Sequence, residues 1–333
     1  MEQLNLATLP KYLSDEAAAW ELLERLRWPN GEVACPHCGV IDPRHYFLAA
    51  QSGERRTRTG HVSYRRIWKC REKGCRRQFS VLVGTIFESS KIPVSKWLLA
   101  MWLMGAGKNG VSALELERHL GISYKSAWFM AHRLREAMTR EPLAALLSGT
   151  VVADETYVGG APKNRHASRR VGARQGLSDK TPVVALVHKE SGTVRTRVVA
   201  NVNRENLRSV LTDNVVTKAT HLHTDASKLY PQLAPLFASH QSVNHTAGEY
   251  VRDGVSTNEA ESFFAQFKRS IDGTHHNVSK EHLHRYATEF EFRWNTRKMT
   301  DHERIESLIT KTVGKRLTYR PLTRRNAPPG ATC

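Results

Sequence analysis

The chain has 333 residues and a formal net charge of +18 at pH 7, with 40% apolar and 25% charged residues. This length allows two or three globular domains, and the excess of Lys and Arg favours a polyanionic partner. No apolar run approaches the roughly 20 residues that a membrane-spanning helix needs, and the first residues lack a signal-peptide pattern. We therefore expect a cytoplasmic, nucleoid-associated protein of prokaryotic type without a membrane partner.

The first predicted element is an amphipathic helix over residues 14–27, with Ser14 as its N-cap and Trp28-Pro29-Asn30-Gly31 as its end. Strand-like pieces follow at residues 64–68 and 79–83. Ten Lys or Arg residues lie between Arg55 and Arg77, near only two acids, Glu54 and Glu72. This part of the chain is therefore predicted to be a short, strongly basic β-structure.

Four of the five cysteines form two close pairs, separated by 31 residues: Cys35 with Cys38, and Cys70 with Cys75. Two such pairs are typical of a tetrahedral zinc site, and four protein ligands leave no open position for catalysis. The sequence therefore predicts a structural Zn²⁺. Two alternatives remain open: four incidental cysteines, or replacement of one ligand by His37 or His61.

From Pro93 the pattern is helical, and two further helices are predicted at residues 112–120 and 124–138, joined by Gly121-Ile122-Ser123. A short Gly-containing turn between two helices is typical of a helix-turn-helix, whose second helix contacts DNA. Its candidate DNA-binding residues are Tyr124, Lys125, Arg133 and Arg135. The alternative is a pair of helices that pack in a bundle without contacting DNA.

After Pro142 the apolar period changes to that of strands. We expect a strand at residues 150–157, a hairpin from 183–188 and 194–202, a helix at 205–215, and a strand that ends near Asp225. Helices follow from Ser256 and over residues 280–295. This order predicts an RNase H-like domain of mixed α+β class, a mixed sheet flanked by helices.

Three acids stand at positions that suit metal-dependent chemistry on DNA: Asp154 in a predicted central strand, Asp225 at a strand end, and Glu261 on a helix. Two Mg²⁺ or Mn²⁺ ions held by carboxylates can activate a nucleophile and stabilise the leaving oxygen in phosphodiester cleavage. Lys268 lies two helical turns after Glu261 and shares its face, where it can hold the DNA backbone. The alternatives are a strand-end acid paired with an arginine, an Asp225 that caps a helix, and a solvated Glu261–Lys268 charge pair.

Several segments resemble an insertion-sequence transposase of the ISXO-two-like group. They are Cys-Pro-His-Cys-Gly at 35–39, Arg-Gln-Phe-Ser at 77–80, Gly-Thr-Ile-Phe-Glu-Ser-Ser-Lys-Ile-Pro at 84–93, Asp-Glu-Thr-Tyr-Val-Gly-Gly at 154–160, Thr-Asp-Ala-Ser at 224–227, Ser-Thr-Asn-Glu-Ala-Glu-Ser-Phe-Phe-Ala-Gln-Phe-Lys-Arg at 256–269, and His-Leu-His-Arg-Tyr-Ala-Thr-Glu-Phe-Glu-Phe-Arg-Trp-Asn at 282–295. The resemblance spans nearly the whole chain. It implies a zinc ribbon, a DNA-binding helical region and an RNase H-like DDE catalytic domain.

By this resemblance Asp154 and Asp225 match the first two catalytic acids of the group, in which the third position is Glu or Asn. Glu261 is preferred for that position because of Lys268, with Asn258 and Glu259 as alternatives. The basic stretch at 163–174 resembles the loop that leaves the first catalytic strand, and Lys163, Arg165, Arg169 and Arg170 are its candidate DNA contacts; the alternative is a solvated loop without DNA. Arg269 is a further candidate DNA contact.

The expected domains are residues 1–90 (N-terminal helix and zinc ribbon), 91–142 (helix-turn-helix-like region), 148–312 (RNase H-like DDE domain) and 313–333 (basic flexible tail). The expected function is metal-dependent DNA cleavage and strand transfer at terminal inverted repeats, carried out by a homo-oligomer that also binds target DNA. Two alternatives remain: a non-catalytic DNA-binding regulator, and an RNase H-like nuclease without strand transfer.

Overall fold

The computed structural model describes residues 4–42, 44–56, 62–140, 144–159, 180–244, 247–249 and 251–323. The chain forms two compact units, one of residues 1–138 with 298–333 and one of residues 139–297. Both contain helices and strands, which confirms the predicted mixed class. Among the described residues, no helix is long and apolar enough to cross a lipid bilayer.

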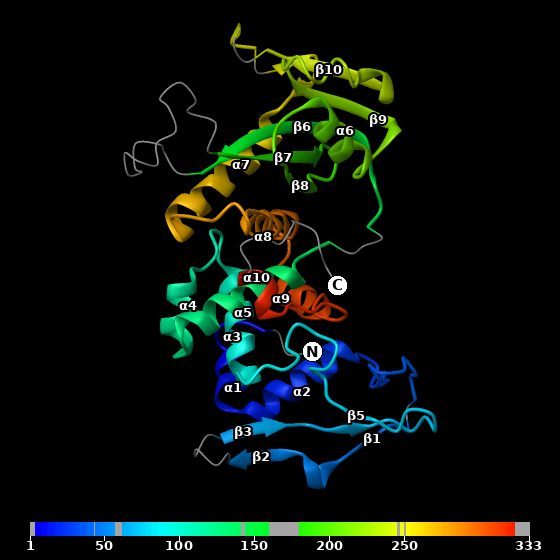
Figure 1. The fold of residues 1–333 in the computed structure, drawn as a ribbon, viewed down its shortest axis with the longest axis vertical. Helices are drawn as coiled ribbons and strands as arrows, with labels where there is room; N and C mark the ends of the chain where they lie inside the picture. The colour runs from blue at the N-terminus through cyan, green and yellow to red at the C-terminus, as the bar shows by residue number, and fades with distance from the viewer. Residues whose placement is uncertain are drawn as a thin grey trace. The chain divides into compact units, whose positions relative to one another are not determined.

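The first unit combines helices with two small antiparallel β-structures (Figure 1). Its helices are α1 (Leu9–Ser14), α2 (Glu16–Arg27), α3 (Val94–Ala106), α4 (Ala113–Leu120), α5 (Tyr124–Ala137), α9 (Asp301–Thr310) and α10 (Tyr319–Thr323). Strands β1 (Tyr46–Phe47), β4 (Trp68–Lys69) and β5 (Gln78–Phe79) form a sheet in the order β1-β4-β5, and β2 (Gly53–Arg56) pairs with β3 (Val62–Arg65).

The start of α2 differs from the prediction. Ser14 is the last residue of α1, and Asp15 is the N-cap of α2, where its carboxylate accepts the amides of Ala17 and Ala18. Pro10 lies at the start of α1, a position that tolerates its missing N–H, so a short helix precedes the cap. The strand predicted at 64–68 is divided between β3, which ends at Arg65, and β4, which begins at Trp68, and β5 ends at Phe79 instead of reaching residue 83.

Helices α4 and α5 lie within one residue of their predicted limits. Ser112 and Glu115 form a capping box at the start of α4, and Ser123 caps α5. Gly121 ends α4 with φ +57°, a left-handed conformation that glycine adopts without strain. These local signals account for the tight turn between the two helices.

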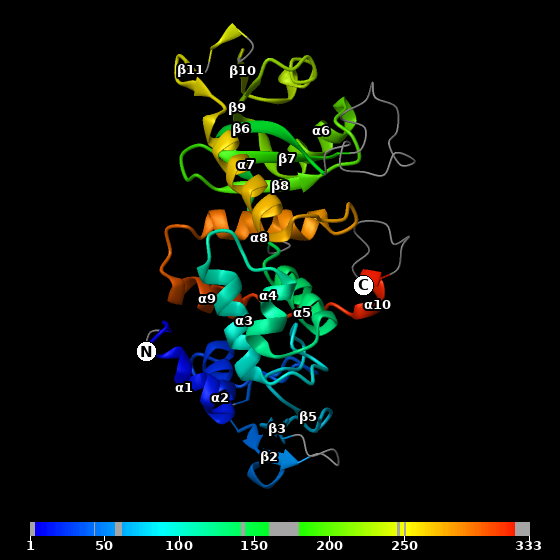
Figure 2. The ribbon, with the colours of Figure 1, turned by 90° about the vertical axis from the view of Figure 1, so that its left-hand side faces the viewer.

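Helix α9 comes from the far end of the chain and packs against α3 in the same unit (Figure 2). Gly105 of α3 lets the two helices approach closely, because a Cβ atom at that position would collide with Ile305 of α9. The Arg304 guanidinium donates to the Gly105 carbonyl at 2.9 Å. The C-terminal segment therefore completes the core of the unit that the N-terminal residues begin.

The second unit is built on a five-stranded mixed sheet. Its elements are β6 (Leu147–Val158), β7 (Thr181–His188), β8 (Val194–Val198), α6 (Arg204–Thr212), β9 (Val215–Asp225), β10 (Ser239–Val243), β11 (Val251–Arg252), β12 (Val255–Ser256), α7 (Asn258–Ser270) and α8 (Leu283–Asn295). The strand order is β10-β9-β6-β7-β8. Strands β6, β7 and β8 are antiparallel neighbours, whereas β9 runs parallel to β6 and β10 parallel to β9. Strand β10 and the β11–β12 hairpin were not predicted from the sequence.

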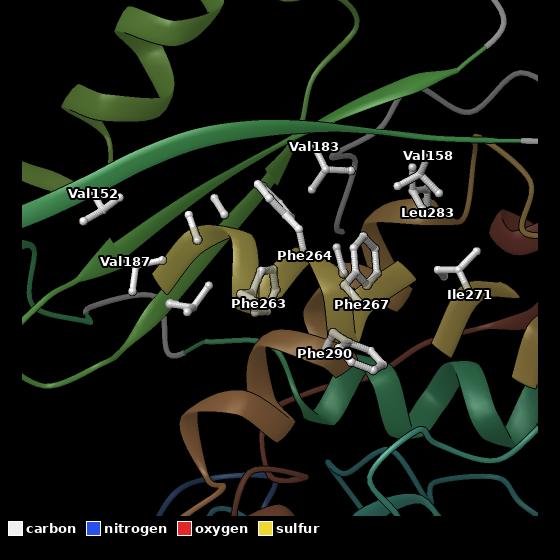
Figure 3. Close-up of a cluster of buried hydrophobic side chains, with 14 residues drawn as sticks. Val152, Val158, Val183, Val187, Phe263, Phe264, Phe267, Ile271, Leu283 and Phe290 are labelled. Atoms are coloured by element: carbon white, nitrogen blue, oxygen red, sulfur yellow. The ribbon is translucent and has the colours of Figure 1, made fainter. Parts of the chain in front are cut away.

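Alternating residues of β6 divide the apolar core between the two faces of this sheet. Val152 and Val158 pack with Phe263, Phe267 and other side chains of α7 and α8 on one face (Figure 3). Val151 and Ala153 pack on the other face, against α6 and the segment that follows β9. This alternation is the period of two that a strand buried on both faces requires.

Candidate active site and metal centre

The four cysteine sulfurs of the first unit converge, with all four Sγ atoms within 4.8 Å of one another. Cys35 Sγ lies 3.8 Å from Cys75 Sγ, and Cys38 Sγ lies 3.7 Å from Cys70 Sγ. A tetrahedral ion with Zn–S bonds of about 2.3 Å places its sulfurs about 3.8 Å apart. The residues present therefore fit a structural Zn²⁺ with four thiolate ligands.

Backbone turns hold each cysteine pair. In the first, the amide of Cys35 donates to Val40 O and that of Gly39 to Cys35 O; in the second, the amide of Cys70 donates to Arg77 O. His37 faces the carbonyl of Gln78 at 3.3 Å, so the tetrahedral set needs no histidine. His61 lies outside the described residues.

Asp154 and Asp225 come from adjacent parallel strands. Strand β6 pairs with β9 in a register that joins Thr150 to His221 and Val152 to His223. Continued for two residues, the same register sets Asp154 beside Asp225. Paired strands lie about 4.8 Å apart, so we expect the two aspartates, two residues beyond the last printed pair, to lie near each other.

Both aspartates are expected on the face covered by α7. Asp154 alternates with Ala153 and keeps the parity of Val152, which packs against α7. Asp225 is two residues after His223 and therefore shares its face of the strand, whereas Leu222 packs on the opposite face. The two half-buried carboxylates therefore point to the same side of the sheet.

Backbone amides orient both carboxylates. The amide of Glu155 donates to Asp154 Oδ1 at 2.8 Å, and the amide of Ser227 donates to Asp225 Oδ1 at 3.0 Å. The second contact is a local turn and not the cap of an α-helix, since no α-helix begins there. Within the described ranges, no Lys or Arg side chain forms an ion pair with Asp225.

A third carboxylate lies behind this pair. Glu155 points to the opposite face, where the hydroxyl of Tyr230 donates to its carboxylate. Burial raises the pKa of Glu155 to about 7; the hydrogen bond from Tyr230 opposes this rise, and the charges of Asp154 and Asp225 add to it. Both aspartates therefore lie close enough to Glu155 to act on it electrostatically.

The candidate third acids lie in the first turn of α7. Phe263 contacts Trp294 of α8, whose Nε1 donates to Gly192 O in the β7–β8 turn. That side of α7 therefore faces the β8 edge. Glu261 is two residues away, about 200° around the helix, and is expected on the side nearer β9.

Asn258 lies one turn before Glu261, on a neighbouring part of the same exposed side, whereas Glu259 lies on another side of the helix. The hydroxyl of Ser256 donates to the Glu259 carboxylate at 3.2 Å. The N-cap of α7 is Thr257, one residue after Ser256, from which the sequence predicted a helix. Lys268 and Arg269 are exposed in the last turn of the helix.

An ion site needs at least three His, Cys, Asp or Glu side chains close together. In the part of the chain that the structure describes, only the four cysteines meet this condition. The acids of β6, β9 and α7 are not drawn together as tightly. Like charges at such a site repel one another, and a bound cation removes that repulsion.

The predicted DNA-binding residues of α5 separate into two groups. Tyr124 and Lys125 are exposed at its start. Arg133 and Arg135 are only 5% and 2% exposed, so the expectation that they contact phosphates is wrong for this conformation. Arg133 lies between the rings of Trp97 and Phe129 and donates to Glu88 O at 2.6 Å.

The burial of Arg133 changes its electrostatics. Desolvation, together with the nearby charge of Arg316, lowers the pKa of its guanidinium to about 10, and the charge of Glu88 opposes this change. Its aromatic neighbours and the carbonyl of Glu88 stabilise the planar cation inside the unit. The predicted contacts Lys163, Arg165, Arg169 and Arg170 lie outside the described residues.

Two models of transposase domains match the two parts of the chain that carry these residues. Residues 14–78 match the transposase zinc-ribbon domain, and residues 146–295 match the ISXO2-like transposase domain. The first match contains all four cysteines, and the second contains Asp154, Asp225 and Glu261. Both domains are those of transposases, and the chain is a transposase. Its larger domain matches that of the ISXO2-like group, which its motifs also resemble.

One relative agrees with this assignment, whereas one solved structure adds nothing to it. The chain is 28% identical over 308 residues to a protein of transposable element ISH50 from Halobacterium salinarum, covering 90% of this chain and 97% of that protein. A cryo-EM structure of the simian T-cell lymphotropic virus intasome in complex with PP2A regulatory subunit B56 gamma shares 14% identity, with a TM-score of 0.28. That match covers 59% of this chain and 64% of that chain, and at this TM-score it carries no argument.

Proposed function

We propose that this transposase cuts DNA at the ends of its mobile element and joins the cut strands to target DNA, with divalent cations held by Asp154, Asp225 and Glu261. One observation carries the proposal: the β6–β9 pairing ends at Val152 and His223, and its register, continued by two residues, brings Asp154 opposite Asp225. The matching transposase domain contains both residues.

The proposed fold of the second unit, residues 139–297, is RNase H-like. Its support is the strand order β10-β9-β6-β7-β8, in which three antiparallel strands are extended on one side by two parallel strands. Helices α6 and α7 cover opposite faces. The aspartates lie on two interior strands, β6 and β9, where Asp154 pairs with β7 and Asp225 with β10.

The donor set suits Mg²⁺ or Mn²⁺, which prefer hard carboxylate oxygens. Asp154 and Asp225 supply one carboxylate each, oriented by the amides of Glu155 and Ser227. Bound divalent cations would supply Lewis-acid activation of the nucleophile and of the leaving oxygen. The protein supplies the fixed geometry of the carboxylates.

Glu261 is the proposed third ligand because helical geometry puts it on the side of α7 opposite Phe263, with Asn258 on a neighbouring part of that side and Glu259 elsewhere. Lys268 lies two turns further along the same helical face and would hold the DNA backbone, with Arg269 beside it.

Double-stranded DNA is the proposed partner, both as terminal inverted repeats and as target. Helices α4 and α5 are proposed to act as a helix-turn-helix, with Tyr124 and Lys125 exposed at the start of its second helix. The basic ribbon would add phosphate contacts. Two element ends must be processed together, so we propose that the active form is a homo-oligomer.

A nicking and joining assay tests this function. DNA that carries the element's ends is incubated with Mg²⁺ and with wild type, Asp154→Ala or Asp225→Ala. Each substitution is expected to reduce nicking by more than about 100-fold, because even changes outside the ligand shell reduce metal-site activity by about 10–100-fold. Asp213→Asn, at an exposed acid after α6, is the matched control and should retain activity.

The same assay separates the alternatives. Added target DNA should yield joined products, whereas nicking without joining would indicate a nuclease. DNA binding with no nicking, or nicking that survives both substitutions, would remove the proposed catalytic site.

A further inference from the structure

The pairing between β6 and β9 ends before it reaches the two aspartates. The last paired residues are Val152 and His223, and Asp154 and Asp225 each lie two residues further along. Strand β6 remains paired with β7 to Val158, and β9 with β10 to Asp225. Each aspartate is therefore held to its outer neighbour, while no ladder hydrogen bond spans the gap between them.

Tyr230 bridges this gap on the opposite face of the sheet. It lies five residues after Asp225, and its ring is fully buried in the core beside α6. Its hydroxyl donates to the carboxylate of Glu155, the residue that follows Asp154. One hydrogen bond thus connects the segment that leaves β9 to the strand that carries Asp154.

The bridge continues to both aspartates through the backbone. On the β6 side, the amide of Glu155 donates to Asp154 Oδ1 at 2.8 Å. On the β9 side, the segment from Asp225 to Tyr230 begins with the Ser227 amide on Asp225 Oδ1, and Thr224 Oγ1 donates to Asp225 O at 2.8 Å. The Tyr230 hydroxyl stands at the centre of this connected set.

Ring packing alone does not account for a tyrosine at this position. Phenylalanine would fill the same apolar volume, whereas a buried hydroxyl or carboxylate is unfavourable unless each finds a partner. Tyr230 and Glu155 are partners for each other, 75 residues apart in the chain. A buried polar pair of this kind restricts the local backbone to one arrangement.

We propose that Tyr230, acting through Glu155, is a positioning residue that fixes the separation of Asp154 and Asp225. The proposal rests on the proposed function, in which this pair holds divalent cations. The hydrogen bond on the opposite face of the sheet would then set the distance between the two aspartates, which the β6–β9 pairing does not set.

The test compares Tyr230→Phe, which removes one hydroxyl, with Tyr157→Phe, which makes the same change on β6. The Tyr157 hydroxyl forms no hydrogen bond within the described residues. Mn²⁺ affinity is measured by calorimetry and by electron paramagnetic resonance, and nicking is measured across a Mg²⁺ series. Tyr230→Phe is expected to weaken Mn²⁺ binding by about 10–100-fold and to raise the Mg²⁺ requirement, as loss of residues that orient metal ligands does.

Glu155→Ala provides the second variant. Because Tyr230 acts through Glu155, adding Tyr230→Phe to Glu155→Ala should change Mn²⁺ affinity by less than about 2-fold, a non-additive result. If Tyr230→Phe fails to unfold cooperatively, Glu155→Ala alone decides the matter. Wild-type Mn²⁺ affinity in a folded Tyr230→Phe or Glu155→Ala protein overturns the inference.

The outcomes for the inference and for the proposed function are distinguishable. A wild-type protein that binds Mn²⁺ through Asp154 but does not nick DNA contradicts the function and leaves the positioning test valid. A wild-type protein that nicks DNA with unchanged metal requirements in Tyr230→Phe contradicts the inference alone.

Discussion

Loss of zinc is predicted to unfold the ribbon while the second unit remains folded. The perturbation is Cys70→Ser, which removes one ligand from the set whose opposed sulfurs lie 3.7 and 3.8 Å apart. Cys70 is fully buried, so a serine hydroxyl there would replace a soft ligand at the centre of the site.

The magnitude follows from how little else holds this segment. Between residues 29 and 80, the described part of the chain fully buries two apolar side chains besides the cysteines, Val33 and Phe79. Each contributes about 1.5–3 kcal/mol. A structural Zn²⁺ contributes about 10–16 kcal/mol in small zinc domains. The metal is therefore the largest single stabilising interaction of the ribbon.

The assay combines metal analysis with limited proteolysis. Wild type should contain about one Zn²⁺ per chain, and Cys70→Ser should contain much less and be cut within residues 33–80. The near-ultraviolet circular dichroism of Trp28, which packs against Trp68 and Phe79, should weaken at the same time. Cys333→Ser, at the one cysteine outside the cluster, is the matched control. A zinc-free protein with an uncut ribbon would refute the reasoning.

Three further predictions concern the core, the titration of a histidine and the partner. Phe267→Ala should lower the unfolding free energy by about 3–5 kcal/mol in urea denaturation, because the ring is fully buried between Phe263 and Phe290; the exposed neighbour Gln266→Ala should change it by less than about 0.5 kcal/mol. Burial lowers the pKa of His284 to about 4, below its ordinary value near 6.5, so the unfolded chain binds more protons between these values. Stability should therefore fall as pH drops through that window, and less steeply in His284→Gln; equal slopes would contradict this assignment. DNA affinity should fall by about 10³-fold or more between 50 and 200 mM salt, and insensitivity to salt would exclude the expected phosphate contacts.

Local signals were sufficient to predict several elements of the fold. The capping box at Ser112, the left-handed Gly121 and the cap at Ser123 are all short-range features, and they set α4 and α5 correctly. The apolar runs before Asp154 and Asp225 likewise predicted the strands that carry them.

Long-range partners could not be predicted in the same way. A helical arginine such as Arg133 is expected to be exposed, and only the folded chain shows that Trp97 and Phe129 enclose it. The Tyr230–Glu155 bond joins residues 75 positions apart, and nothing in either local sequence indicates the other. The choice of the third acid depends on how α7 is rotated about its own axis. That rotation depends on the contact between Phe263 and Trp294.

The contact between Gly105 and Ile305 has a consequence for how the protein is made. The N-terminal unit lacks one of its core helices until residues 301–310 have been synthesised. A nascent chain thus exposes the complete second unit before the first is finished. Truncation just after residue 297 should leave an unfinished surface on α3, so that premature termination yields a protein vulnerable to degradation rather than a working fragment.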